Sequence, residues 1–357
     1  MTLATGLLLL PLGLLALVLL ALGWELLRLL RAQAPTEVRS LLVGGAAPLG
    51  GRAIGAAAGA RAEAPPDAAP GLASGSTSAT ASAIPRVLWS YWNSDTLPPL
   101  IQACADNWRT QAPDHELRFL TPATLRPWLP EGTDTALLER LPPFRQADWL
   151  RLQLLQAHGG IWIDASTVLT GPLDWVHEQQ ARSRAEFVGF YIDRLSRRID
   201  QPMVENWFLA AVPGSRFMAD LNAEFVRALE MGEARYLQAL RDTGRFERVI
   251  QAIDPSLHEY LIMHVAASSL LDAGAERYRL QLQRAEDSAF ALQQALAWKK
   301  RHLYVRLALM REPRRVPALV KLRGNDRRTL ESQLRKRPLR PGSLLARYLP
   351  TLPRQLN

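Results

Sequence analysis

Acidic and basic side chains that could bind a polar ligand are concentrated in two neighbouring segments of the chain. Residues 146–151 read QADWLR and place Asp148 and Arg151 three positions apart, whereas residues 158–166 read HGGIWIDAS and place Asp164 after three large apolar residues. A helix presents positions i and i+3 on one face, the glycine pair stops that helix, and the strand that follows ends at the carboxylate. Because open α/β sheets bind ligands beyond the carboxyl ends of their strands, this order of residues predicts a ligand site.

Each of these charged residues also has a plain structural interpretation, and the sequence leaves both interpretations open. Asp148 and Arg151 could form an intrahelical surface ion pair, which contributes only about 0.3–0.5 kcal/mol. They could instead lie at a partly desolvated edge, because the helix is otherwise apolar over residues 149–155. Asp164 could cap a turn by accepting backbone N–H groups, or its carboxylate could bind a sugar or a divalent cation. The combined spacing of the two segments favours ligand binding.

Hydrophobic periodicity predicts the elements that hold these residues. An apolar stripe predicts a helix over residues 143–157, and the glycines after it precede a short strand over residues 161–163. The β-α-β-α-β order of the first half predicts an α/β fold with a mostly parallel sheet flanked by helices. The other predicted elements are strands over residues 86–92, 116–120, 168–169 and 187–192, a helix over residues 98–110, and mainly helical structure over residues 213–310.

The two ends of the chain differ in composition from its middle. Residues 2–24 contain no ionisable side chain and are rich in leucine, which predicts a retained transmembrane helix within residues 1–27. Basic residues follow this segment, so the positive-inside rule predicts that the rest of the chain lies in the cytoplasm at a bacterial inner membrane. An Ala-, Gly-, Pro- and Ser-rich stretch predicts a flexible linker over residues 28–83. A folded domain over residues 84–330 and a basic tail over residues 331–357 would follow.

Composition narrows the classes of protein to which the chain could belong. Its 357 residues, 48% of them hydrophobic, suffice for one large domain, and its formal net charge is +9. Much of the basic excess lies between Lys299 and Arg340, as either a solvated surface or a surface for anionic lipid headgroups. No recognisable nucleic-acid-binding module accompanies it. The single cysteine, Cys104, excludes an internal disulfide and is predicted to be a buried apolar residue.

Several segments of the sequence together resemble the capsular polysaccharide synthesis family. This family is related to glycosyltransferases with a DXD sugar-binding region, which include initiating mannosyltransferases of yeast and glucosylating domains of clostridial toxins. The resemblance extends from residue 84 to about residue 324. The segments that carry it are IPRVLWSYW at residues 84–92, QADWLR at residues 146–151, GGIWIDAS at residues 159–166, TGPL at residues 170–173 and, more weakly, ENWFLAAVPG at residues 205–214.

The resemblance implies a GT-A fold, a nucleotide-diphosphate sugar as donor, Mn²⁺ or Mg²⁺ as cofactor, and transfer with retention of anomeric configuration. Trp89 would stack on the nucleobase through its flat face, with a core tryptophan as the structural alternative. Trp162 matches an aromatic position that lines the donor pocket. Asp148 and Arg151 would bind hydroxyl groups of the donor sugar, and Arg151 would also stabilise the charge of the leaving diphosphate.

Further residues of the resemblance concern catalysis and the metal ion. Asp164 matches the first acid of the DXD motif, near ribose, sugar and metal. Asn206 matches a position near the reacting sugar, with a helix cap or a backbone bond as its structural alternative. Ser166 stands where the second acid is expected, and a hydroxyl is a poorer metal ligand than a carboxylate. Residues 323–327 resemble a loop that closes over the diphosphate, or form a plain basic turn. Candidates for a substitute metal ligand are Asp254, His258, His264 and Asp326.

The sequence therefore predicts a membrane-tethered glycosyltransferase that faces the cytoplasm and elongates a capsular or other surface polysaccharide or a lipid-linked glycan. Asp164, Arg151 and Asn206 are the predicted catalytic residues, and Asp164 and Ser166 are the predicted metal ligands. Catalysis would rest on positioning and charge stabilisation rather than on a protein nucleophile. Ser166 keeps a second function open, a non-catalytic scaffold that binds nucleotide sugars or glycans in a polysaccharide assembly complex. A luminal or periplasmic transferase is the third alternative.

Overall fold

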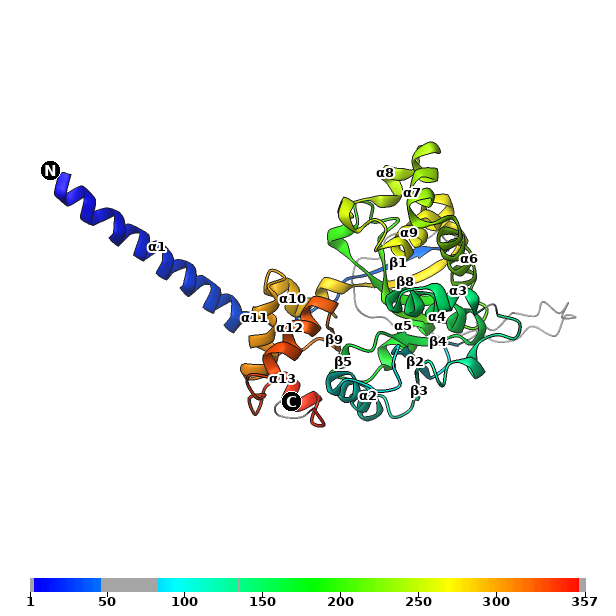
Figure 1. Cartoon of the computed structure of the whole chain (residues 1–357), viewed down its shortest axis with the longest axis horizontal. Coiled ribbons are helices and arrows are strands. Elements are labelled where there is room, and N and C mark those ends of the chain that lie inside the picture. Colours follow the sequence, from blue (N-terminus) through cyan, green and yellow to red (C-terminus); the bar gives the residue numbers. More distant parts are fainter. Residues whose placement is uncertain (1–2, 46–82, 134, 353–357) are drawn as a thin grey trace, which may run out of the picture.

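The structure, a computed structural model, describes residues 3–45, 83–133 and 135–352. Its centre is a seven-stranded sheet with the strand order β1-β8-β6-β7-β4-β2-β3, and a second sheet contains β5 and β9. Helices pack against the larger sheet, and a single long helix, α1, projects away from this body (Figure 1). The α/β class that the sequence predicts is confirmed.

The first half of the folded body contains the elements that the sequence predicts, with ends that differ by one or two residues. Strand β2 (Val87–Tyr91) leads into helix α2 (Pro99–Gln111) and then into β3 (Glu116–Leu120), which pairs with β2 in parallel. Helix α4 (Pro143–His158) leads into β4 (Gly160–Ile163), which pairs in parallel with the other side of β2. Strands β2 and β4 are neighbours, so their carboxyl ends meet at one edge of the sheet.

The glycine pair between α4 and β4 is required by its backbone and by its neighbours. Gly159 and Gly160 have φ angles of +63° and +96°, which disfavour other residues. A Cβ atom at Gly160 would also lie 2.9 Å from the carbonyl oxygen of Val87 and 3.0 Å from Trp89 Nε1. The pair therefore ends the helix and lets β4 approach β2 closely.

The second half of the chain makes the sheet mixed. Strand β7 (Val204–Ala211) lies between β4 and β6 (Phe187–Tyr191) and is antiparallel to both. Strand β8 (Arg279–Arg284), within the stretch that the sequence predicts to be mainly helical, pairs with β6 in parallel. Parallel pairing thus holds for β2 with β3 and β4 and for β6 with β8, whereas β7 reverses the direction at the centre of the sheet.

A small antiparallel sheet connects distant parts of the chain beside β4. Strand β5 (Thr167–Leu169) pairs with β9 (Leu319–Lys321), and Thr167 lies opposite Lys321. Only three residues separate β5 from the end of β4. Because of this pairing, Lys321 lies next to the turn that follows β4.

The segment predicted to be a linker over residues 28–83 contains regular structure at its start. Helix α1 (Leu3–Arg31) extends into it, and β1 (Ser40–Gly44) pairs antiparallel with β8 at the edge of the sheet. Val43 is buried, because this apolar residue of β1 packs against the domain. The prediction of a flexible linker is therefore wrong for these residues, and residues 46–82 lie outside the described residues.

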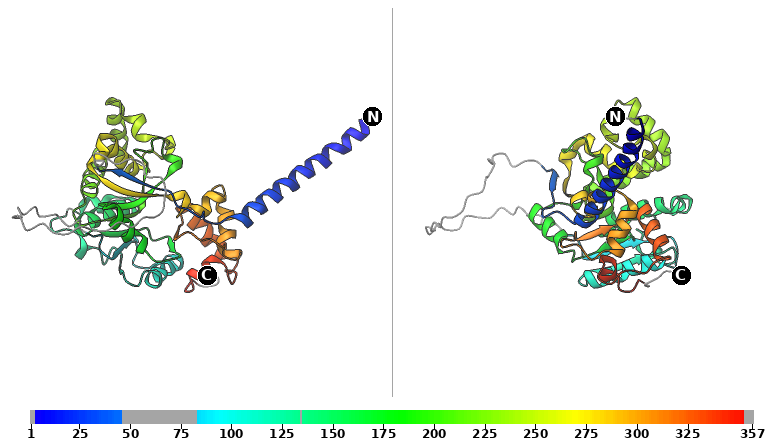
Figure 2. Two further views of the ribbon diagram at one scale, coloured as in Figure 1. Left: turned by 180° about the vertical axis from the view of Figure 1, so that it is seen from behind. Right: turned by 90° about the vertical axis from the view of Figure 1, so that its left-hand side faces the viewer.

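Helix α1 is attached to the body at its carboxyl-terminal end. Glu25 Oε1 lies 2.7 Å from Lys299 Nζ, and the Arg306 Nε–H group donates to the carbonyl oxygen of Ala32 over 2.8 Å. The left-hand view of Figure 2 shows the rest of the helix extending away from the domain, and in the right-hand view the helix points toward the viewer. Among the residues that the structure describes, no helix is both long enough and apolar enough to span a membrane.

The end of the chain is also folded, in contrast to the prediction of a basic tail over residues 331–357. Helix α12 (Gly324–Leu334) and helix α13 (Leu344–Tyr348) pack on the body, and Leu344 and Leu345 are buried. The apolar residues among the arginines explain this packing, and residues 353–357 lie outside the described residues. The remaining helices are α3 (Ala136–Arg140), α5 (Asp174–Ser183), α6 (Arg216–Met231), α7 (Glu233–Asp242), α8 (Phe246–Ile250), α9 (Ile262–Gly274), α10 (Ala291–Ala295) and α11 (Lys300–Tyr304).

Cys104 lies in α2 and is buried, as the sequence predicts. Burial raises the pKa of its thiol to about 12. The thiolate is therefore scarce at neutral pH, which agrees with a packing role rather than a nucleophilic one.

The lowered pKa values of two neighbouring histidines indicate how the stability of the fold depends on pH. The Nε2 atoms of His115 and His177 lie 2.9 Å apart, and burial, together with nearby Arg86, lowers the pKa of both rings to about 4. Because the unfolded chain takes up these protons at a higher pH, we expect stability to fall as the pH decreases from about 6.5 to about 4. In His177→Gln this loss should become smaller. Melting temperatures measured between pH 8 and pH 4 test this expectation, and identical profiles for the two proteins would contradict it.

Candidate functional site

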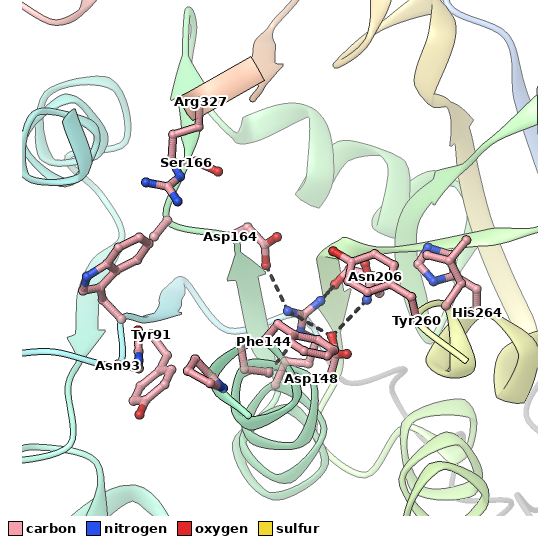
Figure 3. Close-up of a pocket in the computed structure, with 16 residues that line it drawn as sticks. Tyr91, Asn93, Phe144, Asp148, Asp164, Ser166, Asn206, Tyr260, His264 and Arg327 are labelled. Atoms are coloured by element: carbon pink, nitrogen blue, oxygen red, sulfur yellow. Dashed lines mark hydrogen bonds and ion pairs between the residues drawn. The ribbon is translucent and has the colours of Figure 1, made fainter. Parts of the chain in front are cut away.

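A cavity of about 400 Å³ opens where the carboxyl ends of β2 and β4 meet. This is the edge of the sheet at which α/β folds bind ligands. Figure 3 shows Asp148, Asp164 and Asn206 directed toward one another in it, with Ser166 and Arg327 on one side and Tyr260 and His264 on the other. The cavity is lined by Tyr91, Trp92, Asn93, Pro143, Phe144, Ala147, Asp148, Arg151, Asp164, Ala165, Ser166, Asn206, Tyr260, Leu261, His264 and Arg327.

Asp148 and Arg151 lie on the face of α4 that borders this cavity. Arg151 Nη2 is 3.3 Å from Asp148 Oδ1, and the two side chains are only 4% and 7% exposed, respectively. A second cation, Arg145, donates to Asp148 Oδ2 over 3.0 Å. The interpretation as a solvated surface ion pair is therefore wrong, because the pair is buried and belongs to a larger network.

Asp164 follows the last residue of β4, and its backbone N–H continues the ladder to the carbonyl oxygen of Trp207 in β7. Its Oδ1 atom accepts hydrogen bonds from Arg151 Nη2 and Trp162 Nε1, each over 3.1 Å. Its Oδ2 atom accepts from Lys321 Nζ over 2.8 Å. Although burial by itself would raise it, the Lys321 and Arg151 cations hold the pKa of the Asp164 carboxyl below its ordinary value. Asp164 is therefore an anion held between two cations.

Asn206 in β7 completes the network. Its Nδ2 group donates to Asp148 Oδ1 over 3.0 Å, and its carbonyl oxygen accepts a hydrogen bond from Arg151. Arg151 thus contacts Asp148, Asp164 and Asn206 at once. The structure brings together four of the predicted site residues, although they come from one helix and two strands.

Trp89, predicted to stack on the nucleobase, does not reach the cavity. Its side chain is fully buried in the middle of β2, its Nε1–H group donates to the carbonyl oxygen of Gly159 over 3.0 Å, and its ring packs on those of Trp128 and His158. No face of the indole is open to a ligand. Trp89 is therefore a core residue, whereas Tyr91, the last residue of β2, and Trp92, which follows it, line the cavity.

Trp162 also lies behind the cavity rather than in its wall, in contrast to the prediction from the resemblance. It is buried in β4, and the guanidinium carbon of Arg151 lies 5.0 Å from the centre of its ring. Its indole N–H binds Asp164. Trp162 therefore orients both the acid and the base of the network without touching the cavity.

The residues around Asp164 do not suit a divalent cation. Ser166 Oγ donates to the carbonyl oxygen of Leu322 over 2.8 Å and lies 3.3 Å from Lys321 Nζ. Both oxygens of Asp164 are already bound by cations, and a metal ion there would be repelled by Lys321 and Arg151, since unit charges 4 Å apart interact by about 4 kcal/mol near a protein surface. No group of three or more His, Cys, Asp or Glu residues in the described chain could hold a metal ion. The predicted metal site at Asp164 and Ser166 is therefore not supported by its donor set.

The four candidates for a substitute metal ligand lie in different places. Asp254 caps the short helix at Pro255–Leu257, and His258 borders a separate cavity beside α7. Asp326 is bound to Arg323 at the start of α12. Only His264 lines the cavity, where its Nε2 atom lies 3.4 Å from Glu205 Oε2 and its Nδ1 atom has no hydrogen-bond partner among the described residues.

Residues 323–327, predicted to be a loop over the diphosphate or a plain basic turn, form the first turn of α12. Arg327 lines the cavity and lies over the ring of Trp92, with 5.3 Å between its guanidinium carbon and the ring centre. Asp326 bonds the backbone N–H of Arg323 over 3.2 Å. The segment is thus a capped helix start that presents one arginine to the cavity.

Sequence reasoning missed two cations of the site. Arg145 lies three residues before Asp148 on the same helix, so the i, i+3 rule could have found it. Lys321 lies in a three-residue apolar strand far along the chain, and nothing in its neighbourhood marks it. Of the cations of the site, Arg151 and Arg327 line the cavity and give it the capacity to bind phosphate oxygens, while Asp148 and Asn206 can accept from or donate to hydroxyl groups.

Comparison of the structure with solved structures finds glycosyltransferase domains of toxins at low similarity. A structure described as PaToxG glycosyltransferase has 13% identity and a TM-score of 0.30, with 61% of this chain and 84% of that chain covered. The UDP-bound glycosyltransferase domain of the YGT toxin has 10% identity and a TM-score of 0.36, with coverages of 56% and 80%.

Comparison of the sequence with family models finds one match at the site. Residues 74–231 match the model described as capsular polysaccharide synthesis protein, whereas no curated protein matches the chain significantly. The matched residues include Asp148, Arg151, Asp164 and Asn206. They confirm the resemblance of this part of the chain to the capsular polysaccharide synthesis family.

Proposed function

We propose that the chain transfers a sugar from a nucleotide-diphosphate donor to a growing capsular or other surface polysaccharide, at a site of the GT-A type. The observation that carries this proposal is the convergence of Asp148, Arg151, Asp164 and Asn206 on one cavity, within the residues that match the family. A lipid-linked glycan is an acceptor of the same chemistry.

The distribution of groups in the cavity supports a specific placement of the donor. Asp148 and Asn206 are suited to the sugar hydroxyls, because a carboxylate and an amide offer acceptors and donors side by side. Arg327 is suited to the diphosphate, because a guanidinium binds phosphate oxygens in a planar fork. Tyr91 and Trp92 offer the aromatic surface for the base that Trp89 does not provide.

The charges on the two carboxylates support transfer without a protein nucleophile, and retention is proposed from the resemblance to the family. Asp148 is held by Arg145 and Arg151, and Asp164 is held by Arg151 and Lys321. Carboxylates paired in this way are weak nucleophiles. We propose that the acceptor hydroxyl attacks the anomeric carbon from the face that the diphosphate leaves, that its proton passes to the departing phosphate oxygen, and that the cations stabilise the remaining negative charge.

We further propose that α1 attaches the enzyme to a bacterial inner membrane with the domain in the cytoplasm. The part of α1 whose side chains are described exposes many large apolar residues from Leu14 onward. Arg28 and Arg31 follow in the last turn of the same helix, and the ion pair between Glu25 and Lys299 places this end of α1 beside the start of α11. Reporter fusions placed after Arg39 test the orientation, and an extracytoplasmic readout would favour a luminal or periplasmic transferase.

Calorimetry of the full-length protein with a panel of nucleotide-diphosphate sugars tests the proposed activity. We expect one donor to bind and to be hydrolysed slowly in the absence of acceptor. Binding without turnover of any donor, with or without divalent cations, would instead favour the non-catalytic scaffold.

Trp89 in β2 and Trp92, directly after this strand, provide a matched pair of variants. Trp89→Ala should lower the free energy of unfolding by about 3–5 kcal/mol, because a large core side chain is removed. Trp92→Ala should leave stability nearly unchanged and weaken nucleotide binding about 10-fold, because stacking on a base is lost. Denaturant unfolding and calorimetry measure the two effects. An unchanged affinity in Trp92→Ala would remove this residue from the base-binding surface.

A further inference from the structure

Lys321 lies where the DXD resemblance predicts a metal ion. Its ammonium group is 2.8 Å from Asp164 Oδ2 and 3.3 Å from Ser166 Oγ, the two side chains predicted to be metal ligands. The lysine side chain is only 8% exposed. A fixed positive charge of the protein thus lies between the two positions of the motif.

We infer that Lys321 binds the diphosphate of the donor in place of a divalent cation, so that this chain binds nucleoside diphosphates without a metal ion. The inference rests on the proposed function, because it concerns the same donor in the same cavity. It names the residue that supplies the positive charge.

The hydrogen-bonding capacity of the ammonium group supports this role. A lysine carries three N–H donors, and the bonds to Asp164 and Ser166 use two of them. Within the described part of the chain the third has no protein acceptor. Lys321 is not itself among the residues that line the cavity, whereas its partners Asp164 and Ser166 are, so this third donor is available to a phosphate oxygen that reaches between these two side chains.

The turn after β4 holds Lys321 in this position. Thr167 pairs with Lys321 across β5 and β9, the Leu322 N–H group donates to the carbonyl oxygen of Ser166 over 2.9 Å, and Ser166 Oγ donates back to the carbonyl oxygen of Leu322. Ser166 thus fastens the turn to β9, which an acid at this position could not do as a donor. The residue that weakens the metal site is the one that secures the lysine.

A second cation from the same segment extends the positive surface. Arg327 lines the cavity six residues after Lys321, in the first turn of α12. One of its Nη atoms binds Glu331 over 2.9 Å, and the rest of its planar fork can bind phosphate. A lysine and an arginine from one β9–α12 unit would thus hold a diphosphate from one side.

Nucleotide binding with and without divalent cations tests the inference in the wild-type protein. Calorimetry of the full-length chain uses UDP and GDP, first in EDTA and then in Mn²⁺. We expect the affinity for the bound nucleotide to agree within about threefold between the two conditions. A gain of more than about 10-fold with Mn²⁺, which corresponds to 1.4 kcal/mol, overturns the inference and leaves the proposed function standing. If neither nucleotide binds under either condition, the titrations are repeated with ADP, CDP and dTDP, and failure of all five nucleotides contradicts both the proposed function and the inference.

The variant Lys321→Met separates phosphate binding from a purely structural role. We expect it to weaken binding of the nucleoside diphosphate at least about 30-fold and to leave binding of the corresponding nucleoside within about twofold. Equal weakening of both ligands in a folded variant would assign Lys321 to the structure alone and overturn the inference. Lys300→Met, at an exposed lysine of α11, is the matched control and should change neither affinity.

A double variant keeps the test decisive if Lys321→Met alone does not fold. Ser166→Asp combined with Lys321→Met restores two carboxylates and removes the cation between them. We expect Mn²⁺ to raise the melting temperature and the nucleotide affinity of this double variant and to change neither property in the wild type. The same response to Mn²⁺ in both proteins would contradict a substitution of the metal ion by Lys321.

Discussion

Asp164→Asn is expected to lower the rate of sugar transfer by about 10²–10³-fold, the loss typical of one preorganised charged group at a reacting centre. Asparagine keeps the size of the side chain but removes the negative charge that orients Arg151 and Lys321. Both cations would then turn toward other acceptors and away from their positions beside the donor. Steady-state rates of donor hydrolysis and transfer, measured together with the melting temperature, test this expectation.

The control for this variant is an aspartate outside the cavity. Asp174 forms an exposed ion pair with Arg86, so Asp174→Asn should leave the transfer rate unchanged. Activity near the wild-type level in Asp164→Asn would mean that the site is elsewhere.

The lowered pKa of Asp164 predicts the pH range in which this carboxylate stabilises the fold. Because Asp164 remains ionised below its ordinary pKa, its stabilising contribution is present at neutral pH and is lost only below about pH 4.

Arg151→Met is expected to have the second large effect, on both activity and stability. The guanidinium contacts Asp148, Asp164 and the carbonyl oxygen of Asn206, and its removal leaves two buried acids with one fewer cation. Breaking a buried pair in this way costs about 3–5 kcal/mol. We expect transfer to fall by at least about 10²-fold, and denaturant unfolding to show the lost stability.

Arg151→Lys distinguishes charge from geometry at this position. A lysine keeps the positive charge but cannot contact three groups through one planar fork. We expect the stability to recover in part and the activity to stay low. Full recovery of activity would mean that only the charge of Arg151 matters. Arg182→Met removes an exposed arginine of α5 and should alter neither property.

The local part of the site could be predicted from the sequence because its residues lie close together in the chain. The helix with Asp148 and Arg151, the glycine pair and the strand that ends before Asp164 follow one another within residues 143–164. Their spacing fixes which faces they share, and the parallel pairing of β2 and β4 determines the edge at which they meet. Asp148 and Arg151 belong to a buried network rather than to an isolated ion pair, because Arg145 and Asn206 also bond to them.

The contribution of Lys321 could not be predicted, because it depends on a pairing between distant residues. Strand β9 is three residues long and lies more than 150 residues after Asp164. Short apolar strands carry little periodicity, and a lysine at the end of one has no distinguishing spacing. The wrong prediction for Trp89 has a similar reason. The pattern of a strand does not show which of its residues lies in the middle, packed against α4, and which lies at the end, beside the cavity.

The strand β1 was missed for a related reason. Its apolar run, Leu41-Leu42-Val43, is short and stands beside an Ala- and Gly-rich stretch, so composition favoured a linker. Only the presence of an edge strand, β8, to pair with it makes the run a strand. Local composition thus gave the wrong result where a tertiary contact decides the structure.

The position of β1 has a practical consequence for anyone who trims the protein for solution work. A fragment starting at residue 84 would discard β1 and leave the outer N–H and C=O groups of β8 without partners over Arg279–Arg284. Bare edges of this kind join with one another and promote aggregation. A fragment that retains residues 32–45 would keep β1 paired with β8, so that the edge groups of β8 remain hydrogen-bonded.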